Sequence, residues 1–104
     1  MAYPSKYENA QVEILGVPST ARQLTAGSAS SNTALTPTVQ RISIRAVGAD
    51  ISFSIGVGTQ TANGNTSNFI ANGERLDFAV PVGANIAVIR DGTMNGTLEL
   101  TELI

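Results

Sequence analysis

Residues 39–58 read VQRISIRAVGADISFSIGVG, and this stretch decides the fold class. Apolar side chains recur at every second position in both halves, and Gly48-Ala49-Asp50 separates the halves. The apolar set is Ile42, Ile44, Ala46, Ile51, Phe53, Ile55 and Val57. A period of two places alternate side chains on opposite faces of an extended chain. The stretch therefore predicts two neighbouring β-strands, each with one face on a core.

The same alternation continues toward the C-terminal end. It predicts a short strand at residues 67–71, a second at 75–80, a third at 85–90 and a last one from residue 98. Asn72-Gly73 is a favoured pair for a tight hairpin, because both residues tolerate positive φ. Residues 85–90 are nearly continuously apolar, which predicts a strand covered on both faces. Residues 102–104 break the alternation, so we expect the end to bulge or leave the sheet.

The N-terminal third differs in composition from the rest. Residues 12–15 and 20–26 are candidate short strands, and residues 27–37 are rich in Ser, Thr and Ala. This composition is typical of a linker. We therefore divide the single domain into an N-terminal arm, residues 1–37, and an antiparallel β body, residues 38–104. The spacing of the strands predicts an all-β sandwich or small barrel, jelly-roll-like, of about seven to eight strands with an extended N-terminal segment.

Composition narrows the function. The 104 residues include no histidine and no cysteine, so imidazole and thiolate chemistry is not expected. The net charge is −2 without a basic run, which argues against nucleic acid as a partner. No apolar stretch is long enough to span a membrane and no signal peptide is apparent, so synthesis in a cytoplasm is expected. Charged residues make up only 13% of the chain, which favours a surface that faces protein, as in a homo-oligomer.

Carboxylates are the remaining candidates for catalysis. Glu74, Asp77 and Asp91 lie near predicted turns, but their spacing fixes no paired geometry, and solvent-facing charges explain them. Residues 91–96 contain a loop that lacks the alternating oxygen ligands of a calcium site, so a tight turn is favoured. Gly56 and Gly58 have no phosphate-binding pattern around them and indicate a bulge or a close backbone approach. We therefore predict no enzyme activity, no catalytic residue, no cofactor and no metal.

Four residues are candidates for binding a partner. Arg41 and Arg45 share one strand face with Ser43. They are either two solvated arginines or the partners of acidic groups on a neighbouring subunit, a role that suits the guanidinium fork. Tyr3 and Tyr7 of the N-terminal segment are the other two candidates.

Four phrases of the chain resemble small virion proteins of tailed bacteriophages. They are ISIRAVGADI at residues 42–51, FIANGERLD at 69–77, VPVGANIAVIR at 80–90 and GTLELTEL at 96–103. The resemblance covers residues 39–104 and implies a virion structural protein, above all a capsid decoration (cement) protein. It implies a β-rich homo-oligomer on the capsid exterior, made in the bacterial host cytoplasm, with the major capsid protein or other virion proteins as partners. No binding residue carries over.

Three alternatives stay open at this stage. They are a tail, neck or fibre-associated component of the virion, a free-standing binding module for host-surface glycans, and an enzyme. The glycan alternative is weakened by the aromatic content, because sugar sites commonly stack sugars on aromatic rings. The chain holds no Trp, two Tyr and three Phe. Copy number per particle separates a shell protein from a neck or tail component.

Overall fold

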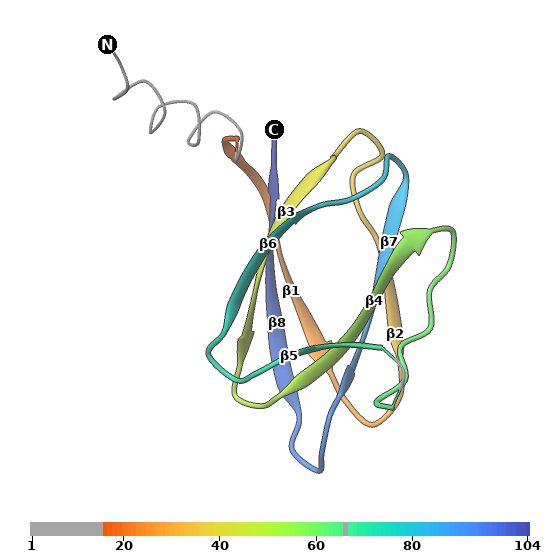
Figure 1. Ribbon diagram of the computed structural model, residues 1–104, viewed down its shortest axis with the longest axis vertical. Coiled ribbons are helices and arrows are strands. Elements are labelled where there is room, and N and C mark those ends of the chain that lie inside the picture. Colours follow the sequence, from red (N-terminus) through yellow and green to blue (C-terminus); the bar gives the residue numbers. More distant parts are fainter. Residues whose placement is uncertain (1–15, 66) are drawn as a thin grey trace.

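A computed structural model describes residues 16–65 and 67–104. This part of the chain holds eight strands, coloured along the sequence in Figure 1. They are β1 (Pro18–Ala26), β2 (Ser31–Ala34), β3 (Arg41–Val47), β4 (Ile51–Val57), β5 (Asn68–Ile70), β6 (Arg75–Ala79), β7 (Ala84–Arg90) and β8 (Gly96–Leu103). No helix occurs in the described ranges.

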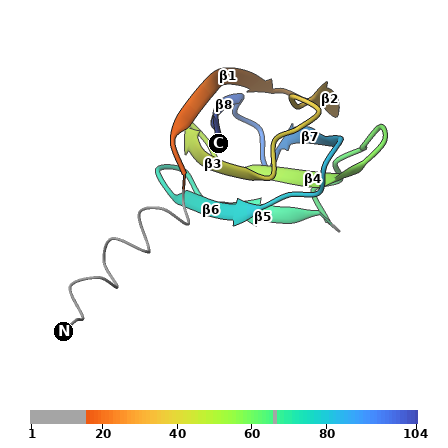
Figure 2. The ribbon, with the colours of Figure 1, turned by 90° about the horizontal axis from the view of Figure 1, so that it is seen from above.

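The strands form two antiparallel sheets that lie face to face. One sheet has the order β1-β8-β3-β6 and the other has the order β2-β7-β4-β5. Figure 2 shows the two layers from above, with β6 and β5 on one side of the molecule and β1 and β2 on another. The predicted all-β class is confirmed, and the architecture is a sandwich.

The core lies between the sheets and follows the predicted alternation. Ile42, Ile44 and Ala46 of β3 are completely buried, whereas Arg41 before them and Arg45 between Ile44 and Ala46 are exposed. β8 contributes Leu98 and Leu100 in the same way. The aliphatic side chains of both inner faces therefore fill one continuous core, as expected for two packed sheets.

β7 is covered on both faces, as its apolar run predicts. Its inward residues Ile86 and Val88 are buried in the core, and Ala87, which points to the opposite face, is also fully buried. In register, Ala87 lies between Asn32 of β2 and Ser54 of β4. Gln60 bridges both neighbours: its backbone N–H donates to Asn32 Oδ1 (2.8 Å), and Ser54 Oγ donates to Gln60 Oε1 (2.9 Å). The segment after β4 thus crosses the outer face of this sheet above Ala87.

The Asn72-Gly73 pair forms a turn, but the prediction of a hairpin is wrong. The N–H of Glu74 donates to the carbonyl oxygen of Ala71 (2.9 Å), and Gly73 has a φ of +86°. However, β5 before this turn and β6 after it belong to different sheets. The positive φ that favours Asn-Gly defines a sharp reversal and does not define which strands will pair.

Residues 102–104 were expected to bulge or to leave the sheet. The predicted departure from the sheet is wrong, and the irregularity at this end lies in β1, whose register against β8 shifts between Pro18 and Ala21. β8 continues to Leu103, with Glu102 opposite Ile42 and Leu103 opposite Arg41 of β3. The charged residue keeps its inward position because other groups compensate its carboxylate, as described below. Ile104 then exchanges two backbone hydrogen bonds with Val17, of 2.7 and 2.8 Å.

The division at residue 37 does not mark a structural boundary. β1 pairs with β8 along its length, and β2 pairs with β7, so both strands belong to the sandwich. Leu35, in the predicted linker, is buried in the core. Residues 16–37 are therefore part of the body, since short polar side chains suit an edge strand as well as a linker. The candidate strand at residues 12–15 lies outside the described residues.

Candidate functional site

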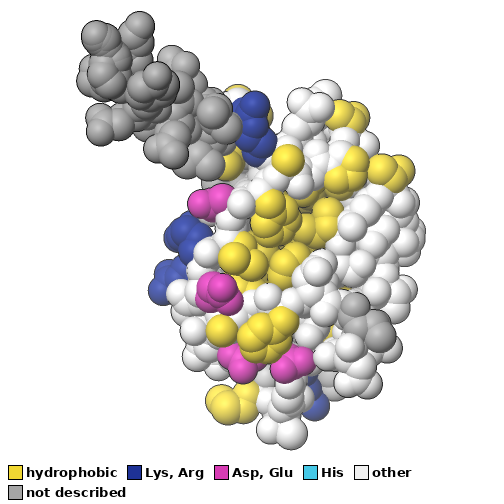
Figure 3. Space-filling view, viewed as in Figure 1, with side chains coloured by type: hydrophobic (Ala, Val, Ile, Leu, Met, Phe, Trp, Pro, Cys, Tyr) yellow, Lys and Arg dark blue, Asp and Glu magenta, His cyan; other side chains and the backbone are white. Residues whose placement is uncertain are grey.

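One side of the sandwich opens into an apolar groove of about 480 Å³. Figure 3 shows hydrophobic side chains gathered on this side of the molecule. The lining residues come from both sheets and from the segment after β6: Phe53, Ile55, Asn68, Phe69, Leu76, Phe78, Ala79 and Pro81. None of these described residues is charged, so the groove suits apolar side chains of another polypeptide better than an ionic ligand.

The groove is open because β5 is short. β5 has three residues and pairs only with the first half of β4, from Ile51 to Phe53. In the described structure, residues 54–57 of β4 therefore have a neighbouring strand on one side only, which is β7. Ile55 consequently lines a space that a longer β5 would have closed.

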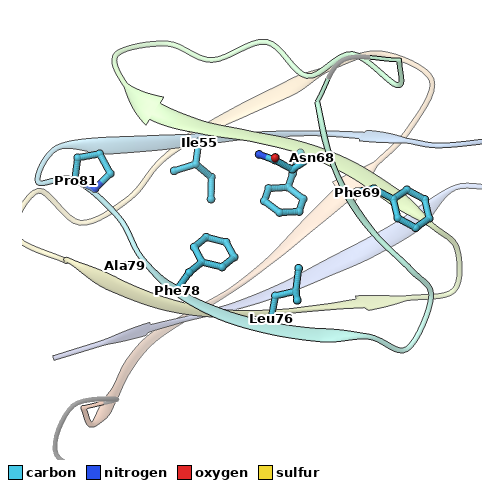
Figure 4. Close-up of a pocket in the computed structure, with 8 residues that line it drawn as sticks. Ile55, Asn68, Phe69, Leu76, Phe78, Ala79 and Pro81 are labelled. Atoms are coloured by element: carbon cyan, nitrogen blue, oxygen red, sulfur yellow. The ribbon is translucent and has the colours of Figure 1, made fainter.

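The two sheets meet at the floor of the groove through a pair of aromatic rings. Phe53 of β4 and Phe78 of β6 stack with their ring centroids 5.9 Å apart and their planes 6° from parallel. Figure 4 shows Ile55, Leu76 and Phe78 pointing into the space between the strands, with Phe69 at its end. Phe69 is 51% exposed, so part of its ring adds to the apolar surface in contact with solvent. The groove therefore offers a rigid aromatic floor and an exposed apolar rim.

The opposite side of the sandwich is closed by a buried charge network. Glu102 of β8 is 1% exposed, and its Oε2 accepts hydrogen bonds from Arg22 Nε (3.1 Å) and from the backbone N–H of Thr36 (2.9 Å). Arg22 Nη2 also lies 3.1 Å from Oε2. Arg22 belongs to β1 in the same sheet as Glu102, whereas Thr36 follows β2 of the other sheet. One carboxylate therefore joins the two sheets at this side.

The surroundings of Glu102 favour its charged form. Burial by itself would raise the pKa of this carboxyl, but the hydrogen bonds from Thr36 and Arg22, together with the guanidinium charge, outweigh burial and hold the pKa below its ordinary value. This explains how a carboxylate occupies an inward position of β8 without disrupting the strand.

The candidate partner-binding arginines lie on the outer face of the β1-β8-β3-β6 sheet. Arg45 Nη1 is 3.7 Å from Glu99 Oε1 of the adjacent strand, and both side chains are almost half exposed. Arg41 is exposed at the start of β3, opposite Leu103 and Ala79. The structure therefore gives Arg45 an acidic partner within its own chain. Tyr3 and Tyr7 lie outside the described residues.

We expect Arg45→Ala to change the free energy of unfolding by less than about 0.5 kcal/mol, because an exposed ion pair contributes little. If Arg45 also contacts a neighbouring subunit, the variant will assemble more weakly than the wild type at low salt and equally at high salt. Light scattering at the two salt concentrations measures this. Unchanged assembly at both concentrations would remove Arg45 from the candidate partner-binding residues.

Of the candidate carboxylates, Glu74 holds a turn and Asp91 binds a side chain of β4. Glu74 Oε1 accepts from the N–H of Ala71 (2.9 Å), and Asp91 Oδ1 accepts from Ser52 Oγ (3.1 Å). Asp77 is exposed on β6, opposite Ser43. Within residues 16–65 and 67–104, no three side chains of the metal-binding types form a group that could hold an ion.

The groove escaped sequence reasoning for a physical reason. Alternation assigns Phe53 and Phe78 to inward faces, but it carries no information about which strands face each other across the core. Glu102 did give a signal, because a charged residue followed Leu98 and Leu100 at an inward position. We interpreted that signal as the end of the strand, whereas it marks a buried ion pair.

Comparisons with known proteins add a fold relationship. No protein-family model matches the chain, and a search of curated proteins finds no match. Among solved structures, the crystal structure of PirA is similar, with a TM-score of 0.54 and 17% sequence identity over 79% of this chain and 92% of that chain. At this identity the likeness concerns the fold alone. In the described ranges, no helix has the length and apolar character needed to cross a bilayer.

Proposed function

We propose that this protein is a virion structural protein, serving as a decoration (cement) protein on the exterior of a phage capsid. Its partners are then the major capsid protein or other virion proteins, and it acts as a homo-oligomer without enzymatic activity or cofactor. The observation that carries the proposal is the apolar groove on one side of the sandwich, lined by residues of both sheets. Such a surface fits contacts with other polypeptides.

Two further features support this proposal. The sandwich is tied together from both sheets by buried side chains, so it offers a stiff body for repeated contacts on a lattice. The low share of charged residues also suits a surface that is largely covered in an assembly. Many copies on one shell would bind with avidity, so each contact can be individually modest.

Counting copies of the protein in purified particles tests the proposal. Quantitative mass spectrometry is expected to find hundreds of copies per particle, and image reconstruction is expected to place them on the outer surface of the shell. Six or twelve copies would instead support the tail or neck alternative. Absence from the particle, combined with binding to a defined sugar on a glycan array, would overturn the proposal in favour of the glycan-binding alternative.

A further inference from the structure

The open side of the sandwich also exposes a free strand edge at β6. β6 is the last strand of its sheet and pairs only with β3 in the described structure. The N–H of Val80 donates to the carbonyl of Gln40 (2.8 Å), and the N–H of Ala46 donates to the carbonyl of Glu74 (3.2 Å). These bonds show that the even-numbered residues of this segment direct their backbone groups toward β3.

The odd-numbered residues of β6 consequently face outward. Backbone groups of successive residues in an antiparallel strand point to alternate sides within the sheet. The N–H and C=O groups of Arg75, Asp77 and Ala79 are thus directed at the open edge. No hydrogen-bond partner for these backbone groups occurs within the described part of the chain. They form a template on which another strand can pair.

The other sheet edges are less suited to such pairing. β2 has four residues and β5 has three, and neither carries a charged side chain that could select a partner strand. β1 is longer, but it starts with Pro18, and its register shifts between Pro18 and Ala21. Short strands, proline and register shifts are devices that protect edges. β6 has no proline and no register shift, and its two charged side chains, Arg75 and Asp77, protect it against strands whose charges do not match.

The charges on β6 identify the strand that it can accept. Arg75 and Asp77 are two positions apart on the outer face, and Arg75 Nη1 donates to Ser43 Oγ of β3 (2.9 Å) within its own chain. In an antiparallel pair of two β6 strands with the two-fold axis at Leu76, Arg75 of each copy lies opposite Asp77 of the other. The same register places the free backbone groups of these residues opposite each other, so they can form hydrogen bonds. An axis at Asp77 would instead bring two aspartates together, which is unfavourable.

We propose that the partner of this edge is a second copy of the same chain, paired antiparallel over residues 75–77 of β6 around a two-fold axis at Leu76. The two sheets then join into one eight-stranded sheet. The mouth of the groove lies beside the same edge, because Leu76, Phe78 and Ala79 line it. A second copy therefore also covers part of this apolar surface. This inference deepens the homo-oligomer of the proposed function by naming its interface, which is isologous.

Charge reversal tests the register. Sedimentation of the purified full-length chain is expected to show a dimer for the wild type. Asp77→Arg and Arg75→Asp should each weaken the dimer at least about tenfold, because like charges then face each other. The double variant should restore it, because it exchanges the two charges and keeps the net charge. A monomeric wild type at micromolar concentrations, or a double variant as weak as the single ones, would overturn the proposal.

Cysteine cross-linking gives an independent measurement, since the chain has no cysteine of its own. At the two-fold axis, Leu76 faces Leu76 of the second copy in a pair with closely spaced side chains. Oxidised Leu76→Cys is expected to form a covalent dimer. Asp77→Cys is the matched control and should remain uncross-linked, because Arg75 is its opposite residue. The reverse result would contradict this register.

These tests separate the dimer from the proposed function. A chain that is monomeric in solution but abundant on particles would overturn the β6 interface and leave the decoration role in place. A chain that dimerises but is absent from particles would leave the β6 interface in place and overturn the decoration role.

Discussion

Replacing Glu102 with alanine is expected to lower the free energy of unfolding by about 3 kcal/mol. Removal of one partner from a buried pair costs about 3–5 kcal/mol, because the other charge loses its compensation. The lower end applies here because Arg22 retains 27% exposure and can be partly hydrated. The backbone N–H of Thr36 also loses its acceptor. Urea denaturation monitored by circular dichroism measures the change.

Glu102→Gln and a pH series are the controls for this effect. The amide can still accept a hydrogen bond but carries no charge, so its cost should be smaller than that of alanine. The folded-state pKa of Glu102 is lowered, so its contribution is present above the unfolded value of about 4.3 and is lost as the pH falls through the folded value. The melting temperature of the wild type should therefore fall more steeply below about pH 4.3 than that of Glu102→Gln. Equal slopes, or a loss below about 1 kcal/mol for Glu102→Ala, would contradict the assigned role.

Phe53→Ala is expected to destabilise the protein by about 3–4 kcal/mol, within the range for removing a buried aromatic side chain. Phe53 is 3% exposed and stacks on Phe78 of the opposite sheet. Its removal leaves a cavity under the groove. It also removes the contact between the two sheets at the place where β5 is too short to cover them. Chemical denaturation gives the free energy, and binding or dimerisation assays report whether the groove has changed shape.

Two variants serve as controls for Phe53→Ala. Phe53→Leu keeps most of the apolar volume and should cost clearly less than alanine. Phe69→Ala removes a ring of the same type from the groove, but this ring is 51% exposed, so the loss should stay below about 1.5 kcal/mol. If Phe53→Ala and Phe69→Ala cost the same, Phe53 does not support the floor of the groove.

The strands could be predicted well from the sequence, because a strand with one buried face alternates apolar and polar residues. Ile42, Ile44 and Ala46 alternate with polar residues and are all buried. The run from residue 85 was also correctly predicted to be covered on both faces, and Gln60 contributes to the cover on its outer face. Local patterns report whether a side chain is buried, and they do not report what covers it.

Pairing between distant segments accounts for what could not be predicted. The linker-like residues 31–34 form a strand because β7 has an open edge beside them, and nothing in SNTA itself requires it. At Asn72-Gly73 the chain crosses from one sheet to the other, because β6 pairs with β3 and not with β5. Arg45 was predicted to bind a partner, and its contact with Glu99 depends on β8 arriving from the far end of the chain. The groove has the same origin, since its two aromatic rings come from opposite sheets.

The hydrogen-bonded contact between Val17 and Ile104 has a mechanical consequence. These residues stand at the same end of two antiparallel neighbours, β1 and β8. A force that pulls Val17 and Ile104 apart breaks the backbone hydrogen bonds between β1 and β8 one after another, starting at this end, instead of loading all of them together. The sandwich should therefore yield at low force when pulled by these two points, and resist more when the force runs along the two strands and loads all the bonds of the ladder together.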